Sequence, residues 1–308
     1  MRLIALGHVV LDHLLRMETF PAVDTKNLAL AGRDCVGGPA ARAALTAAAL
    51  GVETWFAGCL GNDEPAQRIQ RDFQAAGVRL EGLVSCPGHA TPRASIWVEA
   101  RGGKRTVVLD RGTLPDFPAE QLEQLPWGPG WLLLDGKEPV ALDAARRAKA
   151  AGMHVLLDLG GPRPDIGPLV EVADVVAVSK AFVMSEYPGL DLLQAAANLL
   201  ESGPHLAVIT LGAGGMIVGE RAAEGATPEP YWFPAWPAGK IVDTTGAGDV
   251  FHGALAWALL QEFPTRKALA CAAVAGGLAC RNLGGEVSAL SSDLLLREVD
   301  AAAGLFGL

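Results

Sequence analysis

Short apolar runs alternate with amphipathic segments through the second half of the chain. The apolar runs predict strands at 131–134, 155–157, 175–178 and 206–210. Between them, apolar residues with helical spacing predict helices at 140–151, 166–172 and 191–202. Strands that alternate with helices are typical of βαβ units, so this half predicts a parallel sheet wrapped by helices.

The first half of the chain follows this alternation only in part. Its predicted core elements are a strand at 1–7, a helix at 40–50, a strand at 52–57 and a helix at 65–76. Four further β-rich runs fit no βαβ unit and lie at 9–17, 27–31, 94–100 and 105–110. The last two are joined by Arg101-Gly102-Gly103-Lys104, which is a hairpin signal. We therefore expect a separate small sheet. Residues 225–237, rich in proline and aromatics, predict a loop around an edge hairpin.

A glycine turn lies between a predicted strand at 240–242 and a predicted buried helix at 250–260. Backbone N–H groups in the first turn of a helix have no intrahelical acceptor, and the helix dipole adds partial positive charge there. Gly246, Ala247 and Gly248 are therefore expected to form a cradle for a phosphate or an oxyanion. The two glycines would let a ligand approach the backbone closely.

Asp249 follows this cradle directly. A carboxylate in this position can accept the proton of a hydroxyl while the neighbouring N–H groups stabilise a transferring phosphoryl group. We expect the helix dipole to lower its pKa and to make it a weak base. The alternative is a tight turn in which the aspartate only caps the helix. His252 is the one histidine expected near this chemistry, and the alternative is a helix histidine packed against the separate small sheet.

Composition narrows the range of functions. The chain has 308 residues, 50% of them hydrophobic, and a net charge of −9 without a basic block. We therefore expect no nucleic-acid partner and no anionic membrane partner. No apolar run approaches the roughly 18 residues that a membrane span needs. The five cysteines lack Cys-x-x-Cys spacing, which indicates reduced thiols and a cytoplasmic protein.

Three motifs together carry a family resemblance: Gly37-Gly38, the turn Thr-Leu-Gly-Ala-Gly-Gly at 210–215, and the run Asp-Thr-Thr-Gly-Ala-Gly-Asp at 243–249. With these motifs in this order, the chain resembles the ribokinase-family (PfkB-type) carbohydrate kinases over essentially its whole length. The resemblance implies an α/β fold: a three-layer α/β/α core with a mostly parallel central sheet plus a small β-sheet lid. The core would comprise residues 1–9, 33–92 and 115–308, and the lid residues 10–32 and 93–114.

The resemblance also implies transfer of a phosphoryl group from ATP, with Mg²⁺, to a primary hydroxyl of a sugar. Asp249 would be the catalytic base, and Gly246, Ala247 and Gly248 the anion hole. The remaining implied groups are the sugar site (Asp12, Gly37 and Gly38), the nucleotide site (Ser179, Thr210, Gly212 and Gly215) and a K⁺ site (Asp243, Thr245, Gly284 and Ser288). The alternatives are an exposed aspartate at position 12, ordinary turns at the glycines and a turn-stabilising role for Asp243.

Two departures from the family pattern change the expected ligands. Relatives have an Asn-x-x-Glu pair near the phosphates and magnesium, whereas this chain reads Ser-Lys-Ala-Phe at 179–182. Lys180 or Glu186 would be the substitutes. Where a ribokinase has lysine and asparagine after the two glycines, this chain has Pro39 and Arg42. These differences, together with Val10 two residues before the sugar aspartate, argue against ribose.

Four cations lie in segments that would border the sugar pocket: Lys26, Arg42, Arg111 and Lys137. Arginine captures phosphate, sulfonate and carboxylate groups well, so we expect an anionic sugar derivative. Residues 37–41 and 242–254 look especially like the sulfofructose kinase branch. The alternative is that each cation is a solvated surface charge.

Two other functions remain open from the sequence. A nucleoside kinase of the same fold would stack a base, for which Trp97 and Phe20 are candidates. A regulatory homologue would bind the nucleotide without turnover, and the departure at 179–182 is the one feature that favours it. Apolar strands of a small sheet expose hydrophobic surface, so we also expect a homodimer through the lid.

Overall fold

Nine strands form one sheet in the computed structural model, which describes residues 1–221 and 229–308. The strand order is β13-β12-β11-β10-β9-β8-β1-β4-β5. Their bounds are β1 Arg2–Leu6, β4 Glu53–Leu60, β5 Arg79–Ser85, β8 Gly130–Leu134, β9 Met153–Leu159, β10 Val175–Ser179, β11 Leu206–Thr210, β12 Met216–Glu220 and β13 Tyr231–Phe233. The strands from β5 to β11 run parallel, while β12 and β13 continue the edge as antiparallel strands.

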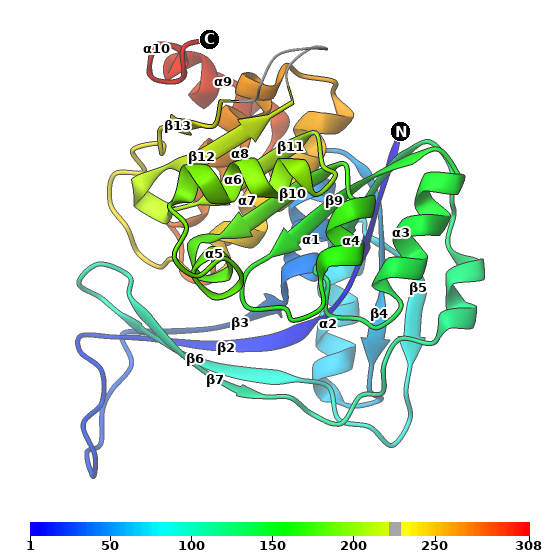
Figure 1. Cartoon of the computed structure of the whole chain (residues 1–308). Helices are drawn as coiled ribbons and strands as arrows, with labels where there is room; N and C mark the ends of the chain where they lie inside the picture. The colour runs from blue at the N-terminus through cyan, green and yellow to red at the C-terminus, as the bar shows by residue number, and fades with distance from the viewer. Residues whose placement is uncertain (222–228) are drawn as a thin grey trace.

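Helices cover both faces of this sheet (Figure 1). One face is covered by α1 Pro39–Ala49, α2 Glu64–Ala75, α7 Ala247–Leu260, α8 Thr265–Ala279, α9 Ser292–Ala301 and α10 Ala303–Phe306. The other face is covered by η1 Ala119–Gln124, α3 Ala141–Ala150, α4 Gly167–Val172, α5 Lys180–Glu186 and α6 Leu192–Glu201. Because side chains alternate along a strand, Leu3 and Ala5 of β1 enter one core, and Ile4 and Leu6 enter the other. Strands buried on both faces are apolar throughout, which explains the uninterrupted runs of the sequence.

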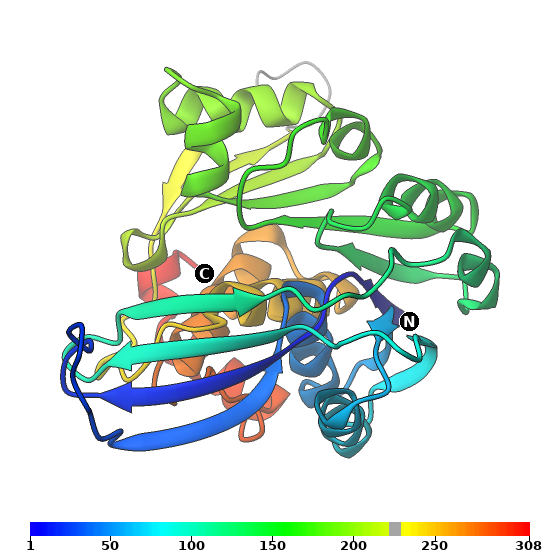
Figure 2. The same cartoon turned by 90° about the horizontal axis from the view of Figure 1, so that it is seen from below.

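A second sheet of four strands lies apart from the first (Figure 2). Its order is β3-β2-β6-β7, with bounds β2 Val10–Met17, β3 Ala31–Gly37, β6 Arg93–Glu99 and β7 Arg105–Asp110. Only the central pair, β2 and β6, is parallel. Leu14, Ala94, Ile96 and Val98 form its apolar face. This small sheet corresponds to the predicted lid.

The predicted strand at 27–31 is wrong, because the strand of this region begins at Ala31. The residues before it turn locally: the side chain of Asn27 donates to the Thr25 hydroxyl, and Leu28 is 84% exposed with no apolar surface to cover it. The predicted boundary at residue 32 therefore cuts through β3, whose residues all pair with β2. The loop between β2 and β3 projects from the far end of the small sheet (Figures 1 and 2).

The chain crosses between the two sheets at two paired places. At the first, Gly38 packs against the carbonyl of His8 so closely that no Cβ would fit, and its φ is 95°. At the second, Gly112 packs in the same way against the carbonyl of Ala90, with a φ of 61°. Thr113 N–H donates to the carbonyl of Ala90 beside this contact, at 3.1 Å. At each place, the segment that enters the small sheet therefore packs against a segment that leaves it.

The predicted strand at 240–242 is also wrong. The N–H groups of Val242 and Asp243 both donate to the carbonyl of Cys280, at 2.8 and 3.2 Å, just past the end of α8. This segment is therefore tied to a helix end and not to a sheet. The expected loop at 225–237 lies partly outside the described residues; within them, β13 pairs with β12 as the edge hairpin.

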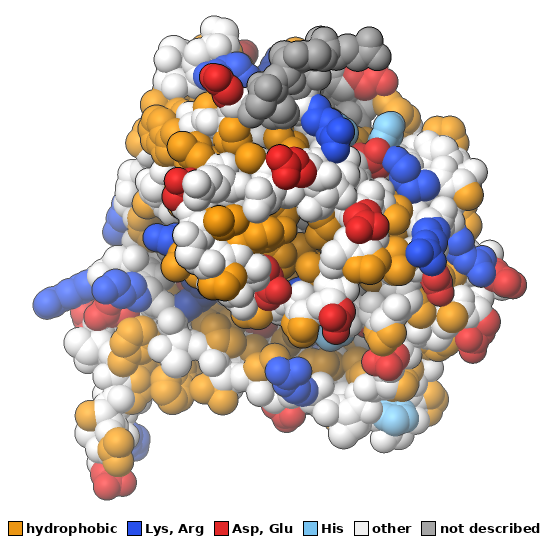
Figure 3. All heavy atoms as spheres, viewed as in Figure 1, with side chains coloured by type: hydrophobic (Ala, Val, Ile, Leu, Met, Phe, Trp, Pro, Cys, Tyr) orange, Lys and Arg blue, Asp and Glu red, His pale blue; other side chains and the backbone are white. Residues whose placement is uncertain are grey.

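In the described ranges, none of the helices combines the length and the apolarity that crossing a bilayer requires. On the face seen in Figure 3, Lys and Arg side chains are interspersed with Asp and Glu and form no continuous basic patch.

Candidate active site

The carboxyl ends of the parallel strands gather polar residues at one edge of the large sheet. Asp158 lies near the end of β9, and Ser179 and Thr210 are register partners at the ends of β10 and β11. Asp135 follows β8 directly. Parallel α/β sheets bind ligands at this edge.

The glycine turn places the start of α7 at Gly246, which caps the helix in the left-handed conformation with a φ of 73°. No acceptor among the described residues bonds the N–H of Gly246 or Gly248. Ala247 differs from the prediction, because its N–H donates to the carbonyl of Thr244 at 3.4 Å. A Cβ on Gly248 would meet nothing within 4 Å, so the side-chain face of this residue is open. The free amides suit an anion.

Asp249 lies in the first turn of α7, and its side chain is 25% exposed. Burial raises the pKa of its carboxyl above the usual value, and the neighbouring Asp158 carboxylate raises it further. Arg42, His252 and Lys137 oppose this rise. The expected lowering by the helix dipole is therefore wrong, because the loss of water around the carboxylate outweighs it. A carboxylate with a raised pKa is a better proton acceptor.

Arg42 of α1 lies beside this carboxylate but is 5% exposed. Its guanidinium donates to the carbonyl of Gly284 at 2.6 Å and to the sulfur of Cys35 at 3.2 Å. It also packs on Gly246, where the nearest guanidinium nitrogen would be 2.6 Å from a Cβ. Most of its hydrogen-bonding capacity is therefore already used within the protein.

Asp12 of β2 faces the same arginine, with its Oδ2 3.9 Å from the Arg42 Nη2. Its carboxylate occupies the space where Gly37 would carry a Cβ, which explains why that position needs a glycine. Burial raises the pKa of Asp12 to about 6, with Arg42 opposing the rise and Asp249 adding to it. The structure thus brings the predicted sugar aspartate and the predicted base together around one guanidinium.

The other three predicted cations do not join this group in the same way. Lys26 lies in the projecting loop between β2 and β3 (Figure 1), away from the sheet edge. Arg111 is exposed just after β7. Lys137 is half-buried near the end of β8, close enough for its charge to act on Asp249. In the described chain, no carboxylate lies within ion-pair distance of any of the three.

The oxygens of the predicted K⁺ site already have hydrogen-bond partners in the structure, and the site stays a prediction. The Asp243 carboxylate accepts from the Thr245 N–H and hydroxyl at 2.8 and 2.7 Å and from the Gly284 N–H at 2.7 Å. The Gly284 carbonyl already accepts from Arg42, and the Ser288 hydroxyl donates to a glutamate at 2.6 Å. A cation would share these oxygens and would lie near the Arg42 guanidinium. Asp243 stabilises the turn through these contacts, as the alternative considered from the sequence has it.

The predicted nucleotide residues lie at the strand ends. Thr210 donates its hydroxyl to the carbonyl of Val178 at 3.2 Å. Gly212 and Gly215 both have positive φ, 59° and 85°, and form the turn into β12. Ser179 caps α5, since its hydroxyl accepts from a backbone N–H at 3.1 Å. These hydrogen-bonding, turn and capping roles explain the local structure, and binding of a nucleotide by these residues stays a prediction.

Sequence reasoning missed three acidic residues at the same edge. Asp135 accepts from the N–H of His8 at 2.9 Å, and burial raises the pKa of its carboxyl. Glu138 lies 3.3 Å from the His8 ring. Asp158 lies 3.0 Å from the ring of His252. An acidic residue at or just after the end of a buried apolar run is the sequence pattern that could have indicated these positions.

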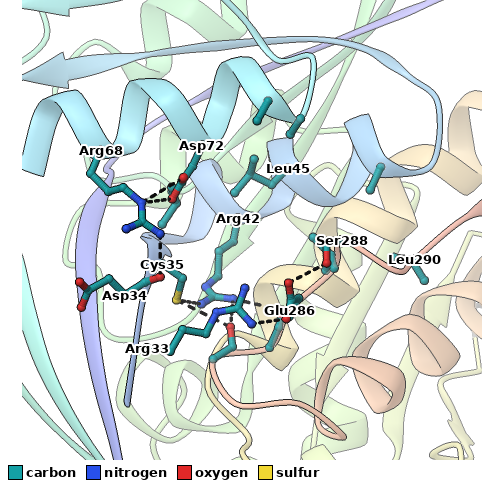
Figure 4. A pocket seen from close by; sticks show the side chains of 17 residues that line it. Arg33, Asp34, Cys35, Arg42, Leu45, Arg68, Asp72, Glu286, Ser288 and Leu290 are labelled. Atoms are coloured by element: carbon teal, nitrogen blue, oxygen red, sulfur yellow. Dashed lines mark hydrogen bonds and ion pairs between the residues drawn. The ribbon is translucent and has the colours of Figure 1, made fainter. Parts of the chain in front are cut away.

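Arg42 also lines a surface pocket of about 410 Å³ (Figure 4). Its polar rim is paired internally: Arg33 with Glu286, and Arg68 with Asp72. Arg42 is the residue that it shares with the group around Asp249. In the described chain, no three His, Cys, Asp or Glu side chains are grouped so that they could hold a metal ion.

Known proteins resemble this chain over nearly all its length. The family model described as pfkB family carbohydrate kinase matches residues 2–291. A bifunctional ribokinase/ribose-5-phosphate isomerase A of Fructilactobacillus sanfranciscensis is 27% identical, with 97% of this chain and 56% of the relative covered. An aminoimidazole riboside kinase of Salmonella typhimurium is 30% identical over 80% of each chain. The structure of Arabidopsis thaliana ribokinase complexed with ribose and ATP superposes with a TM-score of 0.78 and 25% identity, covering 97% of this chain and 98% of that one.

Proposed function

The chain belongs to the PfkB family of carbohydrate kinases, and on that premise we propose that it transfers the γ-phosphoryl group of ATP to a primary hydroxyl of a sugar. The observation that carries this proposal is the position of Asp249. Its carboxylate stands beside the unbonded N–H groups of Gly246 and Gly248, at the edge of the sheet where ligands bind.

Each group has a defined task in this mechanism. Asp249 accepts the proton of the attacking hydroxyl, and its raised pKa improves it as a base. The free amides at the start of α7 stabilise negative charge on the phosphoryl group during transfer. Asp12 holds sugar hydroxyls under the small sheet, and Gly37 leaves room for its carboxylate. The sugar is thereby oriented toward the base.

Magnesium fits this chain only as part of the nucleotide complex. The described residues form no group of acidic or histidine side chains that would cage it. A structural neighbour from E. coli, a putative ribokinase II, is described in complex with ATP and Mg²⁺. Bound in that form, the ion neutralises phosphate charge. None of the tasks assigned above to this chain depends on it.

A neutral sugar fits the site better than the anionic sugar expected from the sequence. Arg42 is bonded to protein carbonyls and faces two carboxylates, so it has little capacity for a substrate anion. Lys26 lies in the projecting loop. Only Lys137 remains close to the group around Asp249. An anionic derivative therefore stays the second candidate, supported by this one cation.

The positions of Trp97 and Phe20 do not support the nucleoside alternative, which depended on these two rings to stack a base. Ala94, Ile96 and Val98 point to the apolar face of the small sheet, so Trp97 points to the opposite face. Phe20 lies in the projecting loop and is 38% exposed. Neither aromatic ring therefore supports base stacking near Asp12.

The test is an ATP-consumption assay on purified protein with ribose, fructose, other neutral sugars, sugar phosphates, sulfosugars and nucleosides. We expect turnover with at least one neutral sugar and none with nucleosides. Turnover confined to nucleosides would replace the proposal with the nucleoside alternative. No turnover with any compound, while ATP still binds, would favour the regulatory homologue.

A further inference from the structure

A buried ion pair lies one helical turn behind Asp249. His252 of α7 is 5% exposed and Asp158 of β9 is 2% exposed. The Nδ1 of His252 lies 3.0 Å from the Oδ2 of Asp158. In the part of the chain that the structure describes, neither atom meets hydrogen-bond geometry with any group, so their contact is a buried ion pair. Each side chain therefore compensates the charge of the other.

The second ring nitrogen of His252 also faces an acceptor. Its Nε2 lies 3.3 Å from the carbonyl oxygen of Ala177 in β10. A neutral imidazole carries one N–H, and only the imidazolium has two donors. With Asp158 ionised, both neighbours face an N–H together only when His252 is doubly protonated. A buried imidazolium is tolerable because the carboxylate beside it compensates its charge.

This pair acts on Asp249 from two directions. His252 is three residues further along α7, and residues with this spacing share one face of a helix. Asp158 reaches the same place from the sheet, so a second buried carboxylate faces the base. The Asp158 charge makes ionisation of Asp249 harder, and the His252 charge makes it easier.

We propose that His252 is a positioning residue, which stays protonated throughout the reaction, cancels the charge of Asp158 and fixes the first turn of α7 against β9 and β10. This inference rests on the proposed role of Asp249 as the base. His252 would touch neither substrate nor the transferring group. Its effect reaches the chemistry through the ionisation and placement of Asp249.

Other charges around Asp249 limit the size of the effect. Arg42 faces it from α1 at 4.0 Å, and Lys137 faces it from the segment after β8. The Asp12 carboxylate acts on it from β2 of the small sheet. These groups are unchanged in the variants below, so shifts between variants report on His252 and Asp158.

The first experiment follows protonation by NMR in the full-length protein without substrate. The His252 ring should remain doubly protonated well past the ordinary pKa of 6.5. The Asp249 side-chain ¹³C signal should titrate at higher pH in His252→Gln and at lower pH in Asp158→Asn than in the wild type. A His252 ring that loses its proton near or below 6.5, or an unshifted Asp249, would overturn the inference.

The second experiment follows kcat/KM against pH with the best sugar. The acidic limb of the pH profile should move to higher pH in His252→Gln and to lower pH in Asp158→Asn. In the double variant it should return close to its wild-type position. A loss of activity by the same factor at every pH would mean that His252 only supports packing. If His252→Gln does not fold, Asp158→Asn and the wild-type titration still decide the question.

The two proposals fail separately. Absence of turnover on every sugar would overturn the proposed function, while the NMR titrations would still decide whether His252 sets the ionisation of Asp249. Normal turnover with a neutral His252 would leave the proposed function intact and overturn the inference.

Discussion

The Nε of Arg42 lies 4.0 Å from the Oδ2 of Asp249. The Nη2 of the same guanidinium lies 3.9 Å from the Oδ2 of Asp12. One buried cation is thus paired with both the proposed base and the proposed sugar-binding carboxylate. It lowers the pKa of both, although burial still holds each above its usual value.

Replacing Arg42 by alanine should cost both stability and activity. The change leaves the Gly284 carbonyl without its donor and two buried carboxylates without their cation. We expect the free energy of unfolding to fall by about 3–5 kcal/mol, measured by urea denaturation. Arg68→Ala is the matched control, since Arg68 lines the same pocket but pairs at the surface within its own helix. Equal behaviour of the two variants would contradict this account of Arg42.

Asp249→Asn should retain the fold and lose catalysis. The amide keeps the shape of the side chain but cannot accept the hydroxyl proton, so we expect kcat to fall by about 10²–10⁴-fold. Asp143→Asn is the control, because Asp143 also lies in the first turn of a helix, α3, but is exposed. Full-speed turnover of Asp249→Asn on the best sugar would rule out this residue as the base.

Asp12 should make the protein less stable as the pH rises through about 6. Its carboxyl has a pKa of about 6 when folded and an ordinary value of 3.8 when unfolded. Folding therefore binds its proton more tightly, and this contribution is complete below about pH 4 and lost as the pH rises through about 6. Asp12→Asn should be more stable than wild type at neutral pH, by on the order of 2–3 kcal/mol. Urea denaturation of both proteins across this range measures the difference, and a difference that does not change with pH would contradict the raised pKa.

Gly37→Ala should impair sugar binding by displacing the Asp12 carboxylate, which occupies the space of the added Cβ. A displacement of this kind should lower kcat/KM by on the order of 10–100-fold. Gly32→Ala in the same strand is the control, because its Cβ would meet the flexible end of Leu15 at 3.3 Å and the Leu14 carbonyl at an ordinary contact distance of 3.7 Å. If both alanines leave kcat/KM unchanged, Asp12 does not hold the sugar.

The homodimer through the small sheet stays a prediction from the sequence, and the structure shows the surface that would form it. Val108 lies on the edge strand β7, on the same face as Trp97, and is 55% exposed. We expect a dimer in sedimentation at micromolar concentration, and Val108→Glu should shift it toward the monomer because it buries a charge. Leu193→Glu on α6 is the control at similar exposure, 46%. A monomeric wild type across this range would remove the prediction.

The sequence predicted the parts of this molecule that depend on local pattern. Apolar runs between helical segments identified the parallel strands, and the glycine turn identified the start of α7 and Asp249. Contacts between residues far apart in the sequence could not be predicted from local pattern. The strand predicted at 240–242 is a segment tied to Cys280, and Arg42 bonds carbonyls more than 240 positions away.

The same limit explains the misjudged electrostatics of the site. A helix dipole can be inferred from a sequence, but the burial of a carboxylate cannot, and burial decides the direction of the Asp249 pKa. The pairing of His252 with Asp158 likewise joins a helix to a strand 94 positions earlier. Only the folded sheet edge brings these two residues together.

The two glycine contacts at the crossings between the sheets, Gly38 on His8 and Gly112 on Ala90, bear on how the small sheet can move relative to the core. Both close contacts would have to break for the small sheet to slide over the core. We therefore expect its rigid-body movement to be a hinge rotation about the line through these two points. Such a rotation carries Asp12 toward or away from Asp249 along a fixed arc, so admitting a sugar and aligning it with the base would be one movement.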